Sequence, residues 1–263
     1  VVQRSTRAPL RGLTDRDRNV REIRAAVDRA ERESGGEPVT LYDYDPDAFG
    51  DDGRAVIGIG DMDRASNVSF SVPGLGTTAR TASDGVGNTL ALHKEAKASG
   101  GTVATVAWIG YDAPSGMSGL LDVAGEEKAA AGGDALAADL RDFAVARDVV
   151  SGGGAPGPSL HVIGHSYGST TVGFAGADGR LAGIVDTVTL LGSPGAGPIA
   201  RAEDFGIGAS NVFVAADDMD PVAHLGAVPG IPYSGVTLGN DPLTTGFGAQ
   251  RFGAEGASDS LYI

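Results

Sequence analysis

The sequence has no cysteine among its 263 residues. Disulfide bridges, a thiolate nucleophile and cysteine-ligated metal are therefore excluded. Lysine is almost as scarce, since it occurs only at Lys94, Lys97 and Lys128, and arginine supplies the remaining positive charge. With 34 acidic and 20 basic residues, the formal net charge is −14. Because such a surface repels phosphate backbones, we expect no nucleic-acid partner.

Long apolar runs are absent as well. No run approaches the roughly 20 residues that a membrane-spanning helix requires, so we expect no membrane span. No signal peptide is recognisable, although the sequence begins at Val1 rather than at methionine, which is compatible with a processed or trimmed form. These features leave the cellular compartment and the oligomeric state open.

The chain does contain enough apolar residues for a sizeable core. Hydrophobic residues make up 41% of the chain and charged residues 21%, a balance typical of folded proteins. Neither an internal repeat nor a domain boundary is recognisable. The sequence therefore predicts a single domain over residues 1–263, of a size that suits an α/β architecture.

A helix is predicted near the start, from Thr14 to Ser34. Val20, Ile23 and Val27 recur at helical spacing, the first residue of the segment is a threonine suited to capping, and two glycines follow its end. This helix belongs to an N-terminal extension over residues 1–36 that precedes the rest of the fold.

Strands and helices alternate beyond this extension. The pattern predicts a hairpin of strands over 39–44 and 55–59, followed by strands over 67–72, 102–109, 160–163, 185–191 and 211–215. Helices are predicted over 85–98, over 126–147 with a break or kink at Gly132–Gly133, and from Ser169 onward. Such alternation predicts the α/β fold class, with a mostly parallel central sheet and helices on both of its faces.

One motif, Gly164-His165-Ser166-Tyr167-Gly168, follows directly on a predicted strand. The buried-strand run before it and the helix-compatible segment after it form the strand–turn–helix context that a G-x-S-x-G nucleophile elbow requires. The tip of so sharp a turn has a strained backbone, and the flanking glycines leave room that a Cβ would fill. Ser166 is therefore the predicted nucleophile, in preference to a serine that only caps a helix. Ser193, in Leu191-Gly192-Ser193-Pro194-Gly195, lacks the flanking pattern and is interpreted as a turn residue near the site.

Acyl transfer from a serine requires two hydrogen-bond donors for the oxyanion. The first predicted donor is the backbone N–H of Tyr167, and the second is that of Leu75, in the loop Pro73-Gly74-Leu75-Gly76-Thr77-Thr78 after the third strand. The same loop, continued to Ala79, also fits the dinucleotide fingerprint G-x-G-x-x-A, with Glu95 as its acid. That alternative leaves the elbow unexplained, so we expect no organic cofactor.

An acidic partner is expected after the nucleophile, just past the end of a later strand. The segment Asp217-Asp218-Met219-Asp220-Pro221 supplies three carboxylates there. Asp220 is the first choice and Asp217 the second, while Asp220 also suits a helix N-cap in front of Pro221. A calcium site formed by the three aspartates is a further alternative, but their spacing matches no known loop, so no metal is expected.

The general base is the least defined member of the predicted site. His93 lies on a helix before the nucleophile, His161 lies within a strand, and His165 is the variable residue of the elbow and points away from the serine hydroxyl. Only His224 follows the acid, four residues after Asp220, and on a helix the two would share one face. His224 is therefore the predicted base, although it is closer to the acid in the sequence than is usual.

Several segments of the chain are distinctive when taken together: Val72 to Thr78, Ala107 to Pro114, Gly164 to Ser169, Leu191 to Gly195, Leu238 to Pro242 and Phe247 to Ala249. They resemble an actinobacterial α/β-hydrolase family of unknown function, and the resemblance covers nearly the whole chain. It implies an α/β-hydrolase fold and a Ser-Asp-His hydrolase with Asp220 in the place of the acid. The substrates of that family are largely undefined.

The sequence departs from that family near its end. Members carry a His-Ser-x-Tyr stretch shortly after the part that corresponds to residues 247–252. Here Arg251 to Ala257 leads into Ser258-Asp259-Ser260-Leu261 without a histidine. Either a segment with that histidine is absent from this chain, or His224 takes its place, or the protein is catalytically impaired.

These features predict a serine hydrolase that cleaves an ester through an acyl-enzyme intermediate. Its substrate would be a small-molecule ester or amide, with no metal or organic cofactor. The alternatives are an amidase or peptidase that uses the same site, and a binding protein on the same scaffold. Met117, Leu120 and Leu121, within residues 112–126, are expected to form either an apolar lid or core beneath a loop.

Overall fold

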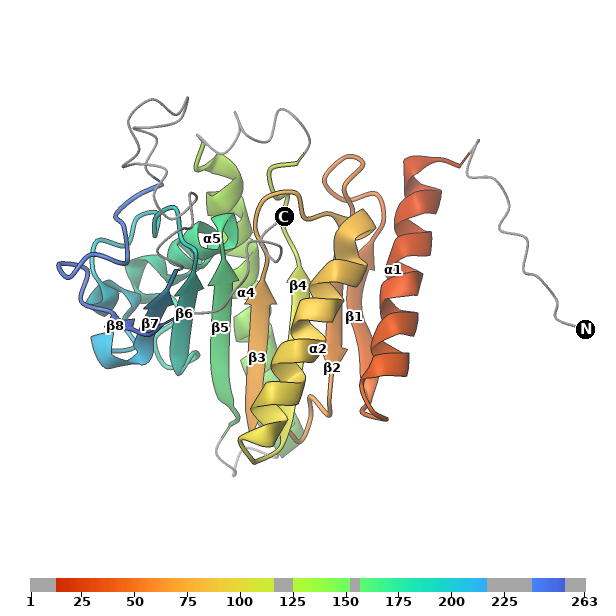
Figure 1. Cartoon of the computed structure of the whole chain (residues 1–263), viewed down its shortest axis with the longest axis horizontal. Coiled ribbons are helices and arrows are strands. Elements are labelled where there is room, and N and C mark those ends of the chain that lie inside the picture. The colour runs from red at the N-terminus through yellow and green to blue at the C-terminus, as the bar shows by residue number, and fades with distance from the viewer. Residues whose placement is uncertain (1–12, 116–124, 152–156, 217–237, 254–263) are drawn as a thin grey trace, which may run out of the picture.

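A single eight-stranded sheet runs through the molecule, in the order β1-β2-β4-β3-β5-β6-β7-β8 (Figure 1). The computed structural model describes residues 13–115, 125–151, 157–216 and 238–253. β2 is antiparallel to both β1 and β4. The six strands β4, β3, β5, β6, β7 and β8 run parallel to one another. The strands are β1 (Val39–Asp45), β2 (Arg54–Ile59), β3 (Asn67–Val72), β4 (Val103–Ile109), β5 (Ser159–His165), β6 (Thr187–Leu191), β7 (Val212–Ala215) and β8 (Gln250–Arg251).

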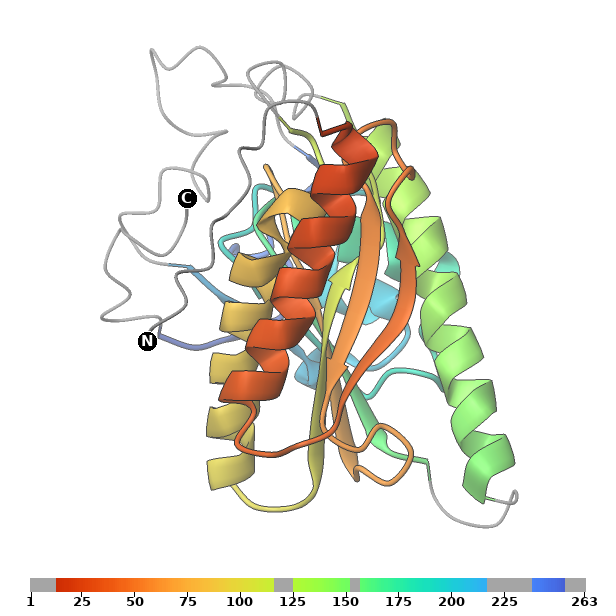
Figure 2. The same cartoon turned by 90° about the vertical axis from the view of Figure 1, so that its right-hand side faces the viewer.

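Helices cover both faces of this sheet, as the sequence pattern predicts (Figure 2). The α-helices are α1 (Asp15–Glu33), α2 (Ala82–Ala98), α4 (Glu127–Ser151) and α5 (Tyr167–Gly176), and the 3₁₀ turns are η1 (Ala79–Thr81), η2 (Ala177–Gly179), η3 (Ala202–Phe205) and η4 (Ala209–Asn211). One core joins α1 and α2 to β2 and β4, and the larger core joins α4 and α5 to the opposite face. Within the described residues, no helix has the length and apolarity needed to cross a membrane.

The N-terminal helix and the hairpin are confirmed close to their predicted bounds. Thr14 caps α1 by accepting a hydrogen bond from the Asp17 N–H, and the Asp17 carboxylate accepts from the Thr14 N–H in return. The buried face of α1 includes Ile23, Ala26 and Ala30. Helical periodicity and an N-cap therefore locate this element correctly from local residues alone.

The break predicted at Gly132–Gly133 is wrong, because α4 continues through both glycines. A Cβ on Gly132 would lie 2.7 Å from the Tyr111 ring, and one on Gly133 would lie 2.5 Å from the Phe174 side chain. Both glycines thus allow α4 to pack closely on Tyr111 and on α5. The packing in these tertiary contacts outweighs the low helix propensity of glycine, which costs about 1 kcal/mol per residue relative to alanine.

Candidate active site

The predicted sharp turn is present between β5 and α5, with Ser166 at its tip. Ser166 has φ 54° and ψ −129°, a backbone conformation that L-residues rarely adopt and that costs about 1–3 kcal/mol. Its N–H donates to the carbonyl of Leu191 on the neighbouring strand at 2.9 Å. The side chain is half-buried at the start of α5, where the helix dipole favours negative charge.

The two glycines of the motif are required by close contacts on opposite sides of the turn. A Cβ on Gly164 would lie 2.6 Å from the Cα of Ser169, in the first turn of α5. A Cβ on Gly168 would lie 2.3 Å from the carbonyl oxygen of Val72, at the end of β3. The turn therefore packs directly on β3, which places Ser166 at the carboxyl edge of the parallel strands. Open α/β sheets place their ligands at this edge.

Two buried hydroxyls, Ser169 and Ser193, hold the carbonyl group of Ser166; we call this pair the serine clamp. The Ser169 hydroxyl donates to the Ser166 carbonyl oxygen at 2.6 Å, and the two clamp oxygens lie 2.6 Å apart. Since Ser169 has a single hydroxyl proton, Ser193 must donate to Ser169. Ser193 also accepts a hydrogen bond from the Gly195 N–H at 3.2 Å. Ser193 is thus a turn residue near the site, as interpreted from the sequence, and it also supports Ser166 through Ser169.

The loop after β3 lies against the nucleophile turn. A Cβ on Gly74 would lie 2.8 Å from the Cβ of Ser166 and 2.9 Å from the backbone nitrogen of Tyr167. Leu75 follows at once, with 43% of its surface exposed. Within the described part of the chain, the Leu75 N–H has no hydrogen-bond acceptor. The two predicted oxyanion donors, Leu75 and Tyr167, therefore belong to segments that the structure brings together.

A stack of three aromatic rings supports this loop and turn, a role that no local sequence pattern predicts. Tyr111 stacks on Trp108 with a centroid distance of 5.9 Å and on Tyr167 with a centroid distance of 6.5 Å. The Tyr111 hydroxyl donates to the Pro73 carbonyl at 2.7 Å, and burial raises the pKa of Tyr111 above its usual range, which keeps this donor protonated. The Tyr167 hydroxyl donates to the Gly125 carbonyl at 2.7 Å. The only sequence signal for this stack was the Trp108–Tyr111 segment of the family resemblance.

Three of the four histidines lie on the α2 side of the sheet. His93 is buried on α2, and its Nδ1 lies 3.3 Å from the Thr105 hydroxyl. His161 on β5 is half-buried, and its Nδ1 lies 2.8 Å from the Thr187 hydroxyl. His165 lines a hollow of about 290 Å³ that also includes residues of α2. Burial lowers the pKa of both His93 and His161.

The remaining predicted site residues lie outside the described part of the chain. These are the acid Asp220, its alternative Asp217 and the base His224. Most of the predicted lid segment, including Met117, Leu120 and Leu121, lies outside it as well. The described structure therefore brings together Ser166, the predicted nucleophile, and the two segments with the predicted oxyanion donors.

Comparison with known proteins identifies relatives of the chain. It is 35% identical to the uncharacterized protein Rv2079 of Mycobacterium tuberculosis, over 93% of this chain and 39% of that protein. It is 28% identical to the uncharacterized protein Mb0988c of Mycobacterium bovis, over 65% of this chain and 62% of that protein. The chain thus spans less than half the length of its 35%-identical relative.

Two solved esterase structures are similar at low sequence identity. Esterase Est22 is 16% identical with a TM-score of 0.45, over 89% of this chain and 78% of that protein. The Pyrobaculum calidifontis esterase is 12% identical with a TM-score of 0.39, over 92% of this chain and 83% of that protein. A family model described as alpha/beta hydrolase matches residues 45–229, which contain the nucleophile turn and its β3 loop. The chain belongs to the alpha/beta hydrolase family.

Proposed function

We propose that the chain is a serine hydrolase that cleaves a carboxylic ester through an acyl-enzyme intermediate. The observation that carries this proposal is the strained backbone of Ser166 at the carboxyl edge of the sheet, with the Gly74 loop packed against it. A side chain held at such a turn is presented toward bound substrate rather than packed into the core. Membership of the alpha/beta hydrolase family supports the same reaction class.

The proposed reaction has two halves. The Ser166 oxygen attacks the ester carbonyl while its proton passes to a histidine, and the backbone N–H groups of Leu75 and Tyr167 stabilise the oxyanion. Collapse of this intermediate breaks the ester bond, and the leaving alcohol takes the proton from the histidine. Water then attacks the acyl-enzyme in the same way and releases the acid together with free Ser166.

His224 and Asp220 are the proposed base and acid. His93 and His161 face threonine hydroxyls on the α2 side of the sheet, and His165 lines the hollow on that side. His224 is the remaining histidine of the sequence, and Asp220 is four residues before it. Orientation of the imidazole by Asp220 would raise its basicity, as in other serine hydrolases.

Covalent labelling tests the nucleophile directly. A fluorophosphonate probe should label the protein and Ser166→Ala should abolish labelling, because phosphonylation requires an activated serine. Ser99→Ala, at the exposed end of α2, is the matched control and should label like the unchanged protein. Persistent labelling of Ser166→Ala, or no labelling of either protein, would contradict the proposal.

Hydrolysis of p-nitrophenyl acetate tests the base. His224→Ala should lower kcat by on the order of 10³-fold or more, since the serine then lacks a proton acceptor. His161→Gln, a histidine change away from the nucleophile, should leave kcat within about threefold of the original value. If His224→Ala retains full kcat, another group acts as base.

A further inference from the structure

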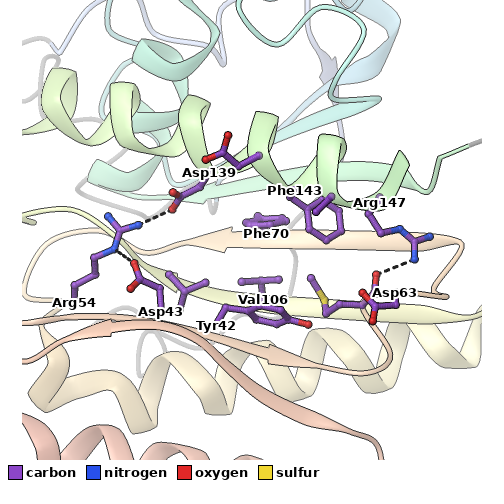
Figure 3. Close-up of a pocket in the computed structure, with 13 residues that line it drawn as sticks. Tyr42, Asp43, Arg54, Asp63, Phe70, Val106, Asp139, Phe143 and Arg147 are labelled. Atoms are coloured by element: carbon purple, nitrogen blue, oxygen red, sulfur yellow. Dashed lines mark hydrogen bonds and ion pairs between the residues drawn. The ribbon is translucent and has the colours of Figure 1, made fainter. Parts of the chain in front are cut away.

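A second hollow lies on the opposite face of the sheet from α2, between α4 and the β1–β2 hairpin; we call it the α4 pocket (Figure 3). Its volume is about 290 Å³, roughly twice that of an engineered cavity that binds benzene. None of the residues that line it belongs to the Ser166 turn or to the loop after β3. It is therefore separate from the proposed active site.

The floor of the α4 pocket is apolar. Val106 is 1% exposed and Phe70 4%, and both side chains reach it from the central strands. Phe143 of α4 packs edge-to-face on Phe70, with a centroid distance of 5.6 Å and an interplanar angle of 68°. Such a rigid aromatic floor suits an apolar ligand body, and particularly an aromatic ring.

Tyr42 forms the outer wall of the pocket. Its ring lies over Gly58 of β2, where a Cβ would come within 2.5 Å of it, and 49% of the residue surface stays exposed. Burial, followed by the nearby charges of Asp63 and Asp61, raises the pKa of the Tyr42 hydroxyl. An exposed aromatic face beside carboxylates is an arrangement that attracts an organic cation.

The two arginines of the pocket are already bound to protein groups. Arg54 donates to Asp43 at 2.6 Å and to Asp139 at 2.8 Å, which closes one end of the pocket. Arg147, at the other end, donates to the carbonyls of Met62 and Ala65 at 3.0 and 2.9 Å. Among the described residues, the buried Nε of Arg147 has no hydrogen-bond partner, so this guanidinium keeps one N–H and its charge. The four aspartates of the lining still outnumber the two arginines, and this excess disfavours an anionic ligand.

The charge that remains at the mouth of the pocket is negative. The residues that line the pocket include four aspartates but only two arginines. Asp63 and Asp142 are exposed at the mouth, and within the described residues neither carboxylate has an ion-pair partner. A ligand with an apolar body on the floor would place a protonated amine near these two carboxylates.

We infer that the α4 pocket binds a small amphiphilic amine, whose aromatic or aliphatic body rests on Phe70, Val106 and Phe143 and whose ammonium group faces Asp63 and Asp142. This binding is independent of the chemistry at Ser166. It would hold whether or not the chain hydrolyses esters.

Three probes of equal length test the charge preference: 3-phenylpropylamine, 3-phenylpropan-1-ol and 3-phenylpropanoate. Calorimetric titration at pH 7.5 should give about tenfold tighter binding for the amine than for the alcohol, and no measurable binding of the carboxylate. Asp63→Asn with Asp142→Asn should remove most of the preference for the amine and leave the alcohol affinity nearly unchanged. Equal affinity for all three probes, or no binding of the amine at millimolar concentration, would overturn the inference.

A filled-pocket variant tests the location. Ala146 is an exposed α4 residue that lines the pocket, so Ala146→Phe should fill the mouth and weaken amine binding at least tenfold. Ala138 is an exposed α4 residue outside the lining, so Ala138→Phe is the matched control and should bind normally. Comparable Tm values for the two variants would show that both fold.

Two further outcomes would also overturn the inference. Unchanged amine binding by Ala146→Phe would place the amine elsewhere on the protein. The sequence carries three arginines before α1, at Arg4, Arg7 and Arg11. Binding that occurs only after these three arginines are changed to alanine would assign the pocket to the chain's own N-terminal segment.

Discussion

At the scale of single residues, the buried hydroxyls of Ser169 and Ser193 help to hold the carbonyl group of Ser166, whose backbone is strained. Ser169 is 0% exposed and Ser193 2%, so the partners of the serine clamp have no access to water. Ser169→Ala would remove the hydroxyl donor to the Ser166 carbonyl, which keeps the Ser169 N–H as a donor at 2.9 Å, and would leave the Ser193 hydroxyl without its acceptor. We expect the free energy of unfolding to fall by about 1–3 kcal/mol, the cost of an unpaired buried polar group. Urea unfolding measures this loss, and Ser99→Ala, on an exposed hydroxyl, should fall by less than about 0.5 kcal/mol.

Protonation of His93 should destabilise the fold. His93 is 3% exposed, and its Nε2 has no hydrogen-bond partner. Burial lowers its pKa below the ordinary value of 6.5, while the charges of Glu37 and Lys97 act in opposite directions. The stabilising contribution of the neutral ring is therefore fully present above about pH 6.5. It is lost as the pH falls from there through the lower pKa of the folded state.

Unfolding by urea at pH 8 and pH 5 measures this loss. The decline in unfolding free energy between the two pH values should be smaller for His93→Gln, which cannot titrate, than for the unchanged protein. His161→Gln provides a comparison, since the pKa of His161 is lowered in the same direction on a half-buried residue. An identical pH dependence of the unchanged protein and His93→Gln would contradict the assignment.

At the scale of elements, two helical glycines should respond oppositely to alanine. Gly133 of α4 faces α5, and a Cβ there would lie 2.5 Å from the Phe174 side chain and 2.7 Å from the Ala175 nitrogen. Gly133→Ala should therefore lower the unfolding free energy by about 1–3 kcal/mol through forced separation of the helices. A Cβ on Gly85 of α2 would lie 3.9 Å from the Cδ1 of Ile109, which is an ordinary van der Waals contact. Gly85→Ala should therefore raise the unfolding free energy by about 0.5–1 kcal/mol. Equal effects in thermal unfolding would show that intrinsic helix propensity, and not packing, decides at both sites.

The same elements show what a sequence can reveal. The turn at Ser166 was predictable because strand, motif and helix are contiguous, so the signal is local. The continuous path of α4 through Gly132 and Gly133 was not, since its cause is contact with Tyr111 and α5. β8 has only two residues, Gln250–Arg251, which is too short to show a period. Its place in the sheet comes from pairing with β7, a distant segment of the chain.

Contacts between distant segments set the same limit for the candidate site. Asp139 accepts hydrogen bonds from Trp108 and Arg54, which precede it by 31 and 85 residues. No periodic pattern in the sequence predicts such a pairing. The serine clamp likewise joins residues 24 positions apart. Sequence motifs could therefore locate the turn at Ser166, the proposed nucleophile, and the segments of Leu75 and Tyr167, but not the groups that hold them in place.

Over the whole molecule, the formal charge of −14 should make stability depend on salt. Long-range repulsion among the excess carboxylates opposes the compact state, and it is screened as the Debye length falls from about 30 Å at 0.01 M to about 8 Å at 0.15 M salt. Exposed ion pairs such as Arg24–Asp28 are weakened by the same screening, but each contributes only about 0–1 kcal/mol. Because an excess of one sign makes the long-range repulsion exceed the long-range attraction, we expect Tm to rise between 0.01 and 0.15 M NaCl.

Thermal unfolding in NaCl and in choline chloride separates this effect from cation binding. The rise in Tm should be the same for both salts, since screening depends on ionic strength and not on the identity of the cation. Two aspartates offer a local comparison. Asp134 pairs with Arg180, whereas the described residues provide no ion-pair partner for Asp142. Asp142→Asn should raise Tm at low salt and reduce its salt dependence, whereas Asp134→Asn should do neither because it also breaks an attraction. A Tm that falls as either salt is added would mean that short-range ion pairs, and not the excess of negative charge, govern the electrostatic part of the stability.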